Sequence, residues 1–236
     1  MTKNNTVAAI HGIFIALGLF LGGLSIGVAF YKAKTADRFV TVKGLAEREV
    51  DADLAIWPIT FRVTDNDLIS LQNEIDQQRQ VIQQFLLDAE FNRDEISRSA
   101  PRIRDAQAEN YGNQTIRYRY VADAVVTVRS SDVAKVRQTM EESGNLVSKG
   151  VVLSADSWQN PTEFLFTALN DIKPAMIEEA TKNAREAAEK FAQDSGSNVG
   201  KIRNASQGFF SITDRDRNSP ERKKVRVVTT IQYYLD

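Results

Sequence analysis

The sequence of 236 residues contains no cysteine and a single histidine, His11. The absence of cysteine excludes disulfides, thiolate metal sites and cysteine nucleophiles. His11 lies inside an apolar segment, so the rest of the chain has no imidazole. This excludes serine–histidine–aspartate catalysis, cysteine–histidine catalysis and histidine metal sites from that remainder.

Glycine-rich phosphate loops are also missing. The twelve glycines form neither GxGxxG nor GxxxxGK[ST]. Carboxylates remain as possible ligands, because Glu47, Glu49, Asp51 and Asp53 alternate and a continuous strand would place them on one face. Calcium usually takes more oxygen ligands from a bent loop, so a solvated strand face is the favoured interpretation. We therefore expect no enzyme activity and no catalytic, cofactor-binding or metal-binding residues.

An excess of positive charge is absent as well. The formal net charge is −1, and residues 1–36 hold three lysines and no acid, so residues 37–236 carry 27 basic against 31 acidic residues. Nucleic-acid binding depends on neutralising phosphates, and this balance argues against it. Three arginines alternate at Arg98, Arg102 and Arg104, and two more, Arg117 and Arg119, are expected on a paired strand with Tyr118 and Tyr120 on its opposite face. Basic residues interleaved with aromatic ones can bind single-stranded nucleic acid. The acidic balance and the apolar run favour a cross-strand ion-pair ladder instead.

One long apolar run begins the chain. Residues 7–31 contain no charged side chain if His11 is neutral, and a helix of that length covers about 37 Å, enough for a hydrocarbon core of ~30 Å. Apolar regions of signal peptides usually span only ~7–15 residues, although cleavage after Ala29 is an alternative. We predict an uncleaved signal-anchor over 1–36, which contacts the lipid bilayer through residues 7–31, and a second domain over 37–236.

Small residues recur within this run. Two GxxxG patterns, Gly18–Gly22 and Gly23–Gly27, overlap a stripe formed by Gly18, Gly22, Ser25 and Ala29. Such a stripe lets membrane helices approach closely and is a candidate self-association face. The alternative is that glycine is simply frequent in membrane helices.

The remaining residues predict strands grouped in pairs between helices, which favours an α+β fold. We expect strands over 39–42 and 54–63, with a bulge at Gly44 and an edge or bulged position for Pro58. Asp65–Asp67 is expected to cap a long helix. Asp171 is expected to cap a second long helix, which has Pro174 in its first turn and ends at Gly196. The apolar face of this second helix is predicted to consist of Met176, Ala180, Ala184, Ala187 and Phe191. The other expected elements are a short helix after Ser131 or Asp132 and strands over 96–104, 115–129, 151–158, 163–169, 201–213 and 223–235.

Several of these segments, in this order, resemble the SIMPL-domain family of bacterial envelope proteins over about residues 38–235. The resemblance is carried by Val40-Thr41-Val42-Lys43-Gly44, Val50-Asp51-Ala52-Asp53-Leu54-Ala55, Tyr118-Arg119-Tyr120-Val121-Ala122, Val126-Thr127-Val128, the helix from Ala180 to Glu189, and Gly196-Ser197-Asn198-Val199-Gly200-Lys201-Ile202. Ala52-Asp53 stands where the family usually has Pro-Asp.

The segments predict a transmembrane helix followed by an α+β domain of paired antiparallel strands packed with two long helices and one short helix, and the resemblance also implies an α+β domain. It further implies a periplasmic domain on the bacterial inner membrane, ring- or channel-like homo-oligomers, and a link in some members to oxidative-stress tolerance. It implies no established reaction. The charge bias favours the opposite orientation slightly, because Lys32, Lys34 and Arg38 follow the apolar run. The alternative function is a periplasmic binding module for a small ligand, peptide or envelope component.

The anchor is testable by N-terminal sequencing of protein extracted from membranes. We expect the first residue to precede the apolar run, because a span of this length is retained as an anchor. A mature chain that begins at Phe30 would contradict this prediction.

Overall fold

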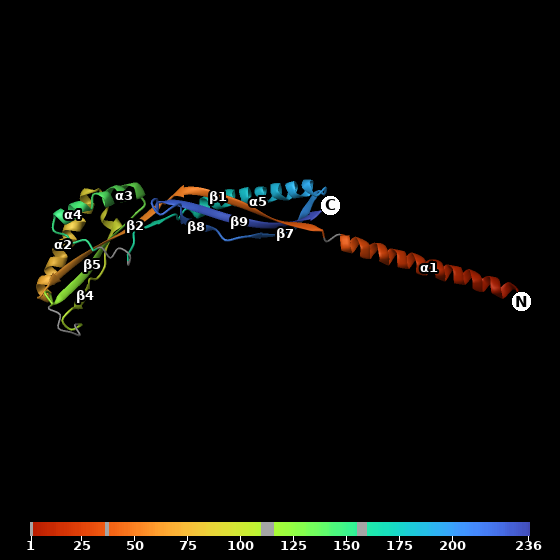
Figure 1. Cartoon of the computed structure of the whole chain (residues 1–236), viewed down its shortest axis with the longest axis horizontal. Coiled ribbons are helices and arrows are strands. Elements are labelled where there is room, and N and C mark those ends of the chain that lie inside the picture. Colours follow the sequence, from red (N-terminus) through yellow and green to blue (C-terminus); the bar gives the residue numbers. More distant parts are fainter. Residues whose placement is uncertain (1, 36–37, 110–115, 155–159) are drawn as a thin grey trace. The chain divides into compact units, whose positions relative to one another are not determined.

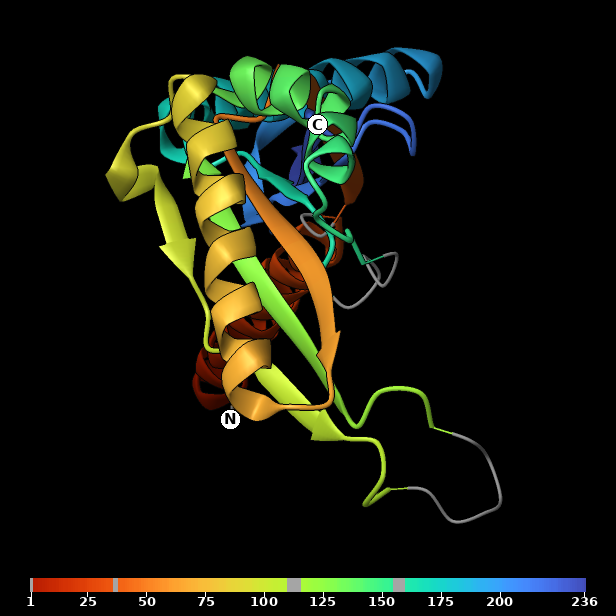
Figure 2. The same ribbon diagram turned by 90° about the vertical axis from the view of Figure 1, so that its left-hand side faces the viewer.

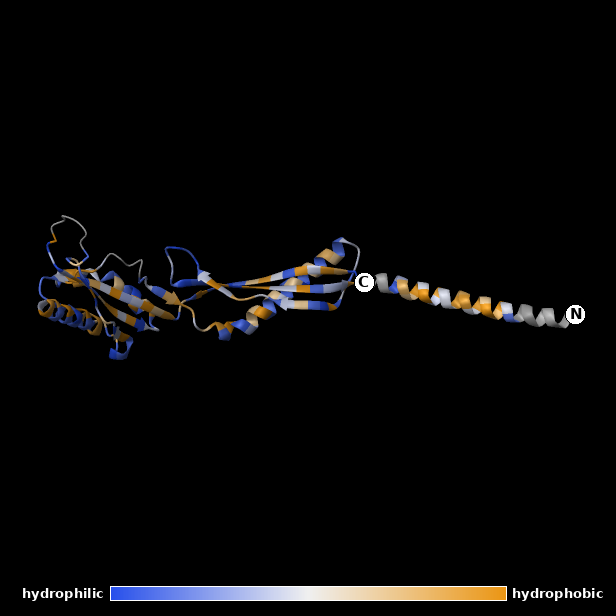
Figure 3. Cartoon of the chain, turned by 90° about the horizontal axis from the view of Figure 1, so that it is seen from below, coloured by the Kyte–Doolittle hydropathy of each residue, from blue (hydrophilic) through white to orange (hydrophobic). Residues whose placement is uncertain are grey.

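The computed structural model describes residues 2–35, 38–109, 116–154 and 160–236, with the backbone alone for 2–10 and 33–35. Its first element is helix α1 (Thr2–Thr35). Within it, the 22 residues His11–Lys32 have a mean hydropathy of 2.4, and none of this stretch is buried against the rest of the described chain. Among the described residues it is the one helical stretch that is long and apolar enough to span a membrane. Apolar residues predominate along this stretch in Figure 3. The predicted domain boundary at 36/37 lies outside the described residues.

The chain divides into two compact units that use alternating segments. The first comprises residues 1–46, 174–210 and 226–236, and the second comprises residues 47–173 and 211–225. Three elements contribute to both units: strand β1 (Phe39–Asp51), helix α5 (Leu169–Asp194) and strand β9 (Arg222–Leu235).

In the first unit, helix α5 packs on an antiparallel sheet. The strand order is β1-β9-β7, where β7 is Val199–Gln207; β8 (Ser211–Asp214), whose residues belong to the second unit, also pairs with β9. Figure 1 shows α5 lying along these strands. The core consists of alternate residues of β1 and β9 with alanines of α5: Val40, Val42, Ala184, Ala188, Ile231 and Tyr233.

The buried row of α5 advances in strict steps of four, through Met176, Ala180, Ala184, Ala188 and Ala192. The predicted face was correct up to Ala184 and wrong beyond it. Ala187 is exposed, and Phe191 is 51% exposed. A ridge of residues spaced by four inclines across a helix surface, so one row can follow a sheet, whereas the predicted steps of three and four trace a straight stripe.

Gly44 is the point of closest approach between α5 and β1. A Cβ atom at Gly44 would lie 1.8 Å from the carbonyl oxygen of Ala180 and 2.5 Å from the backbone nitrogen of Ala184. The predicted bulge is wrong, because burial alternates without interruption through Val40, Val42, Gly44 and Ala46, whereas an inserted residue would shift the alternation. Glycine is required here because helix backbone occupies the space of a side chain.

The second unit contains a five-stranded antiparallel sheet. The order is β3-β5-β2-β6, and β4 also pairs with β5. The strands are β2 (Leu54–Asp65), β3 (Ile96–Arg98), β4 (Arg102–Asp105), β5 (Tyr120–Ser130) and β6 (Glu163–Leu165), and the helices are α2 (Leu68–Asp88), α3 (Val133–Glu141) and α4 (Gly144–Ser148), with a 3-10 turn at Arg93–Glu95. Helix α2 lies across β2 and β5 in Figure 2. Its apolar face meets the inward residues of β2 in one core that includes Phe61, Leu71, Ile75, Ile82 and Leu86.

The predicted α+β class is therefore confirmed, with local corrections. Asp67 caps α2 by accepting hydrogen bonds from Ile69 N and Ser70 N, as expected. Helix α4 is an additional short helix that the sequence did not indicate. The strand expected over 151–158 is an isolated bridge between Leu153 and Phe61, and residues 155–159 lie outside the described ranges.

Pro58 lies on the edge of β2 that faces away from β5, between the residues paired with β6 and the bridge at Phe61, where its missing amide costs no ladder bond. The Arg62 amide donates a hydrogen bond to the Val152 carbonyl, and the Thr60 carbonyl accepts one from the Ser154 amide. Both bonds lie on the side of β2 that faces away from β5. Because hydrogen-bonding directions alternate along a strand, Pro58 faces the same side and removes no bond to β5.

Helix α5 begins at Leu169 rather than after Asp171, which places Pro174 beyond the first turn. The carboxylate at the start of the helix comes from Asp53, in the turn between β1 and β2. Its oxygens accept hydrogen bonds from Thr167 N at 2.8 and 2.9 Å, Thr167 Oγ1 at 2.9 Å and Ala168 N at 2.8 Å. Burial alone would raise the pKa of Asp53, but these hydrogen bonds hold the pKa below its usual value.

Substituting Gly44→Ala is expected to lower the free energy of unfolding by about 1–3 kcal/mol or more, because the new Cβ atom must displace the α5 backbone. Chemical denaturation of both forms measures the difference. Gly144→Ala is the matched control. It meets no atom within 4 Å and lies in a helix, so it should be neutral or stabilising. Equal effects of the two substitutions would contradict the assignment.

Substituting Asp53→Ala is expected to lower the free energy of unfolding at neutral pH by about 1 kcal/mol, because backbone donors lose their acceptor. The pKa of Asp53 is depressed in the folded state, so its contribution is complete above the ordinary value of 3.8 and disappears as the pH falls through the folded pKa. The gap between wild type and variant should therefore narrow below that pH in denaturation curves. Asp171→Ala, at an exposed position of α5, should show a smaller change at neutral pH and no such loss with acid.

Candidate functional site

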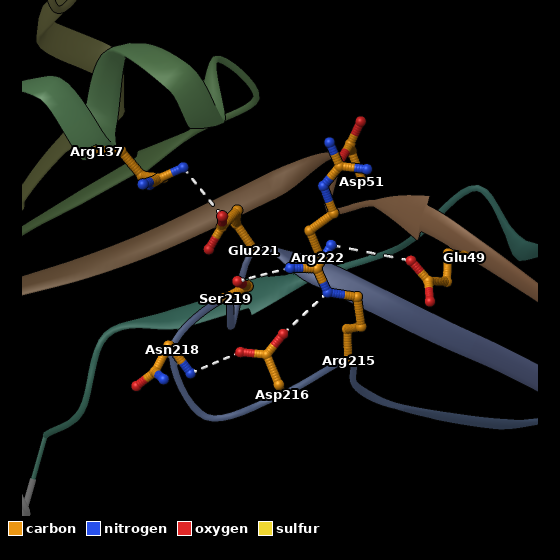
Figure 4. Close-up of polar contacts among 9 residues, drawn as sticks. All are labelled: Glu49, Asp51, Arg137, Arg215, Asp216, Asn218, Ser219, Glu221 and Arg222. Carbon is orange, nitrogen blue, oxygen red and sulfur yellow. Dashed lines mark hydrogen bonds and ion pairs between the residues drawn. The ribbon is translucent and has the colours of Figure 1, made fainter.

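The alternating acidic residues of β1 share one face of the strand, and each meets a basic residue. Glu47 pairs with Lys224 at 2.8 Å, Glu49 with Arg215 at 3.9 Å and Asp51 with Arg222 at 3.1 Å. Figure 4 shows the surroundings of Glu49 and Asp51. Within the described ranges, no group of three or more His, Cys, Asp or Glu residues is placed to hold a metal ion. The acidic alternation is thus one side of an ion-pair ladder.

The ladder continues into the loop before β9. Arg137 of α3 pairs with Glu221 at 3.0 Å, and the Glu221 carbonyl accepts from Ala52 N at 2.7 Å. Arg215 pairs with Asp216 at 2.9 Å, which raises the pKa of Arg215 and lowers that of Asp216. A depression of about 540 Å³ is lined by Asp51, Glu221 and a third acidic residue, Asp132. The Asp132 side chain caps α3 by accepting a hydrogen bond from Lys135 N. Its charged groups are engaged in holding the fold.

The resolved pKa shifts of the carboxyl groups favour the ionised form. Every carboxyl group with a resolved pKa shift in the described chain is shifted downward: Asp53, Asp67, Asp76, Glu95, Asp105 and Asp216. The pKa of Asp105, for example, is lowered mainly by the side-chain hydrogen bond from Arg119. A general acid that works near neutral pH needs a raised pKa. These groups behave as fixed anions.

The five arginines of this series make different contacts. Arg119 pairs with Asp105 at 3.0 Å across the sheet edge, which confirms part of the predicted ladder. Arg117 and Arg119 precede β5 rather than lying within it, and their guanidinium groups lie over the rings of Tyr118 and Tyr120 at 5.4 and 4.9 Å. Arg98 donates a hydrogen bond to Gln83 of α2. Arg102 and Arg104 line a cleft.

This cleft, of about 490 Å³, opens on the face of the second sheet that α2 leaves uncovered. Its floor consists of Thr60 and Arg62 of β2 with Asp123 and Val125 of β5, and its walls of Ser99, Ala100, Arg102 and Arg104 on one side and Ser154 and Asn160 on the other. We call it the arginine cleft. It brings together residues that are up to 100 positions apart in sequence.

Strand register sets the charge pattern of the arginine cleft. Asp123 of β5 is the cross-strand neighbour of both Arg62 and Arg102, so the three residues form one row. Arg62 grips Asp123 in a bidentate pair, with Nε at 2.7 Å and Nη2 at 3.2 Å. Sequence reasoning missed Arg62 and Asp123. The available signal was that each of these charged residues interrupts a mainly apolar strand sequence.

The glycines of α1 present an open surface. Gly18, Gly22, Gly23 and Gly27 have no atom within 4 Å of an added Cβ, so the predicted stripe is uncovered in the described chain. Ser25 Oγ donates to the Leu21 carbonyl at 2.8 Å, so its proton is used within its own helix. Gly23-Leu24-Ser25-Ile26-Gly27 also fits the GxSxG pattern of serine hydrolases, which sequence reasoning overlooked. A hydrolase nucleophile requires a sharp strand-to-helix turn, whereas Ser25 lies inside a continuous helix.

Comparison with known proteins agrees with this architecture. Curated protein sequences give no match to the chain. The family described as SIMPL, protein of unknown function (DUF541), matches residues 40–232, a range that includes both sheets, α2 and α5. The chain belongs to the SIMPL family.

Proposed function

We propose that this chain is a single-pass membrane protein of the bacterial cell envelope that works without enzymatic activity as a homo-oligomer. The observation that carries the proposal is the outer edge of β7 together with Phe209, which follows it.

Strand β7 is bonded along one edge only. It pairs with β9 from Val199 to Gln207, and no strand of the described chain pairs with its other edge. The Gly208 amide donates to the Val228 carbonyl, so by alternation the amides of Ala205 and Gln207 point outward. Unpaired strand edges are templates for pairing with another chain.

Phe209 adds apolar surface directly after this edge. Its side chain is 100% exposed, and Ile202 within β7 is 52% exposed. Large apolar groups are enriched where protein surfaces associate. Lys201 and Arg203 on β7 oppose indiscriminate pairing, which favours a partner of matched register over aggregation.

The second copy of this chain is the occupant that the anchor favours. A membrane helix confines all copies to one surface with one orientation and so raises their effective concentration. The uncovered stripe of Gly18, Gly22, Ser25 and Ala29 gives close packing between anchors. The ring- or channel-like form, and a role in envelope or oxidative stress, extend the proposal by family resemblance.

The periplasmic location also rests on that resemblance.

The absence of imidazole and thiol after His11, and the downward pKa shifts of the carboxyl groups, support a function without catalysis.

The full chain, extracted in detergent and sized by multi-angle light scattering, is expected to be an oligomer. Phe209→Glu should lower the stoichiometry or raise the dissociation constant by about tenfold or more, because it buries a charge in the contact. Ala205→Pro should act similarly, because it removes an outward amide and spares the ladder to β9.

Phe191→Glu is the matched control, since Phe191 is also exposed but lies on α5. It should leave the stoichiometry unchanged. A monomeric wild type at all practical concentrations, or equal effects of the two phenylalanine substitutions, would contradict the proposal.

A further inference from the structure

We propose that the arginine cleft binds a small polar ligand with a doubly charged anionic group, a phosphate monoester or a dicarboxylate. The inference rests on the second unit alone and does not depend on self-association. The shared chemistry is an array of anionic oxygens that guanidinium forks bind with paired hydrogen bonds.

The charge of the cleft favours an anion. Among the described residues three arginines and one aspartate line it, a local excess of positive charge in a chain of net charge −1. Asp123 cannot serve all three arginines, because both of its oxygens already bind Arg62. That bidentate pair also orients the Arg62 side chain in the floor.

Arg102 is the anchor that this arrangement leaves for a ligand. It is exposed and lines the cleft, and its side chain has no hydrogen-bond or ion-pair partner in the part of the chain that the structure describes. Its cross-strand neighbour is Asp123, whose charge Arg62 already balances. An incoming anion would therefore meet a cation whose side chain has no ionic partner among the described residues.

Arg104 supplies the second fork. Its ion pair with Glu109 is 3.5 Å long, and both side chains are more than half exposed, so a ligand can replace that contact at small cost. Arg102 and Arg104 are two residues apart on one strand, which separates their Cα atoms by roughly 7 Å. This spacing allows two guanidinium groups to converge on one phosphate or to hold the two ends of a short dicarboxylate.

The remaining lining selects a small and polar molecule. Ser99, Ser154, Asn160 and Thr60 offer hydroxyl and amide groups, and the Thr60 hydroxyl is buried without a hydrogen-bond partner among the described residues. The volume lies within the usual range for small-molecule sites. Among the described residues that line the cleft none is aromatic, so that part of the lining does not offer the stacking surface on which single-stranded nucleic acids bind.

Isothermal titration of the full chain in detergent micelles tests the proposal. The probes are sodium phosphate, glycerol 3-phosphate and succinate, with glycerol as the uncharged control. We expect saturable binding of glycerol 3-phosphate or succinate that weakens as salt is added, and no binding of glycerol. Which of the two anions binds more tightly identifies the source of the anionic group.

Arg102→Gln should weaken binding by about tenfold or more, since a charged hydrogen-bond partner is lost. Arg226→Gln is the matched control, because Arg226 is an exposed strand arginine outside the cleft. It should bind as wild type does. Thermal melts establish that both variants fold. Absence of saturable binding for all three anions, or equal losses in the two variants, would overturn the assignment.

Discussion

The contact between Gly44 and the backbone of α5 is the constraint on which the first unit depends. The row of alanines on α5 is small enough for the helix to sit directly on β1 and β9, and Asn183 Nδ2 adds a hydrogen bond to the Leu45 carbonyl at 2.7 Å. With so little side-chain volume between the layers, the core consists of strand residues such as Val42 and Tyr233 against a nearly flat helix surface. The sheet and the helix therefore fix each other's position through backbone proximity.

Much of the fold could be predicted from the sequence, because local signals agree with the tertiary structure. The amphipathic face of α2, its Asp67 cap and the alternation of β1 and β9 all follow from periodicity and capping chemistry. The start of α5 could not be predicted in this way. Its carboxylate comes from Asp53, 114 residues before Thr167, so a long-range contact prevailed over the local cap at Asp171. The prediction of the buried face of α5 failed beyond Ala184, because helical spacing alone does not give the direction in which a sheet crosses a helix.

The candidate sites divide along the same line. The acidic alternation of β1 was interpreted correctly as part of a strand face, because the period of a strand is local. The arginine cleft was missed because it depends on register, which sets Arg62, Asp123 and Arg102 in one row across three strands. Single-sequence patterns show that each residue is charged within an apolar run. They do not show which strands are neighbours.

Pro58 has a consequence for how copies of the chain can meet. The outer edge of β2 is paired with β6 at Leu54–Ile56 and bridged to Leu153 at Phe61. Between these points Pro58 offers no amide, so an invading strand could not extend a continuous ladder along this edge. The second sheet is thereby protected against uncontrolled strand addition at a position where its neighbours are short. Strand pairing between copies, as proposed for β7, requires an edge without such an interruption.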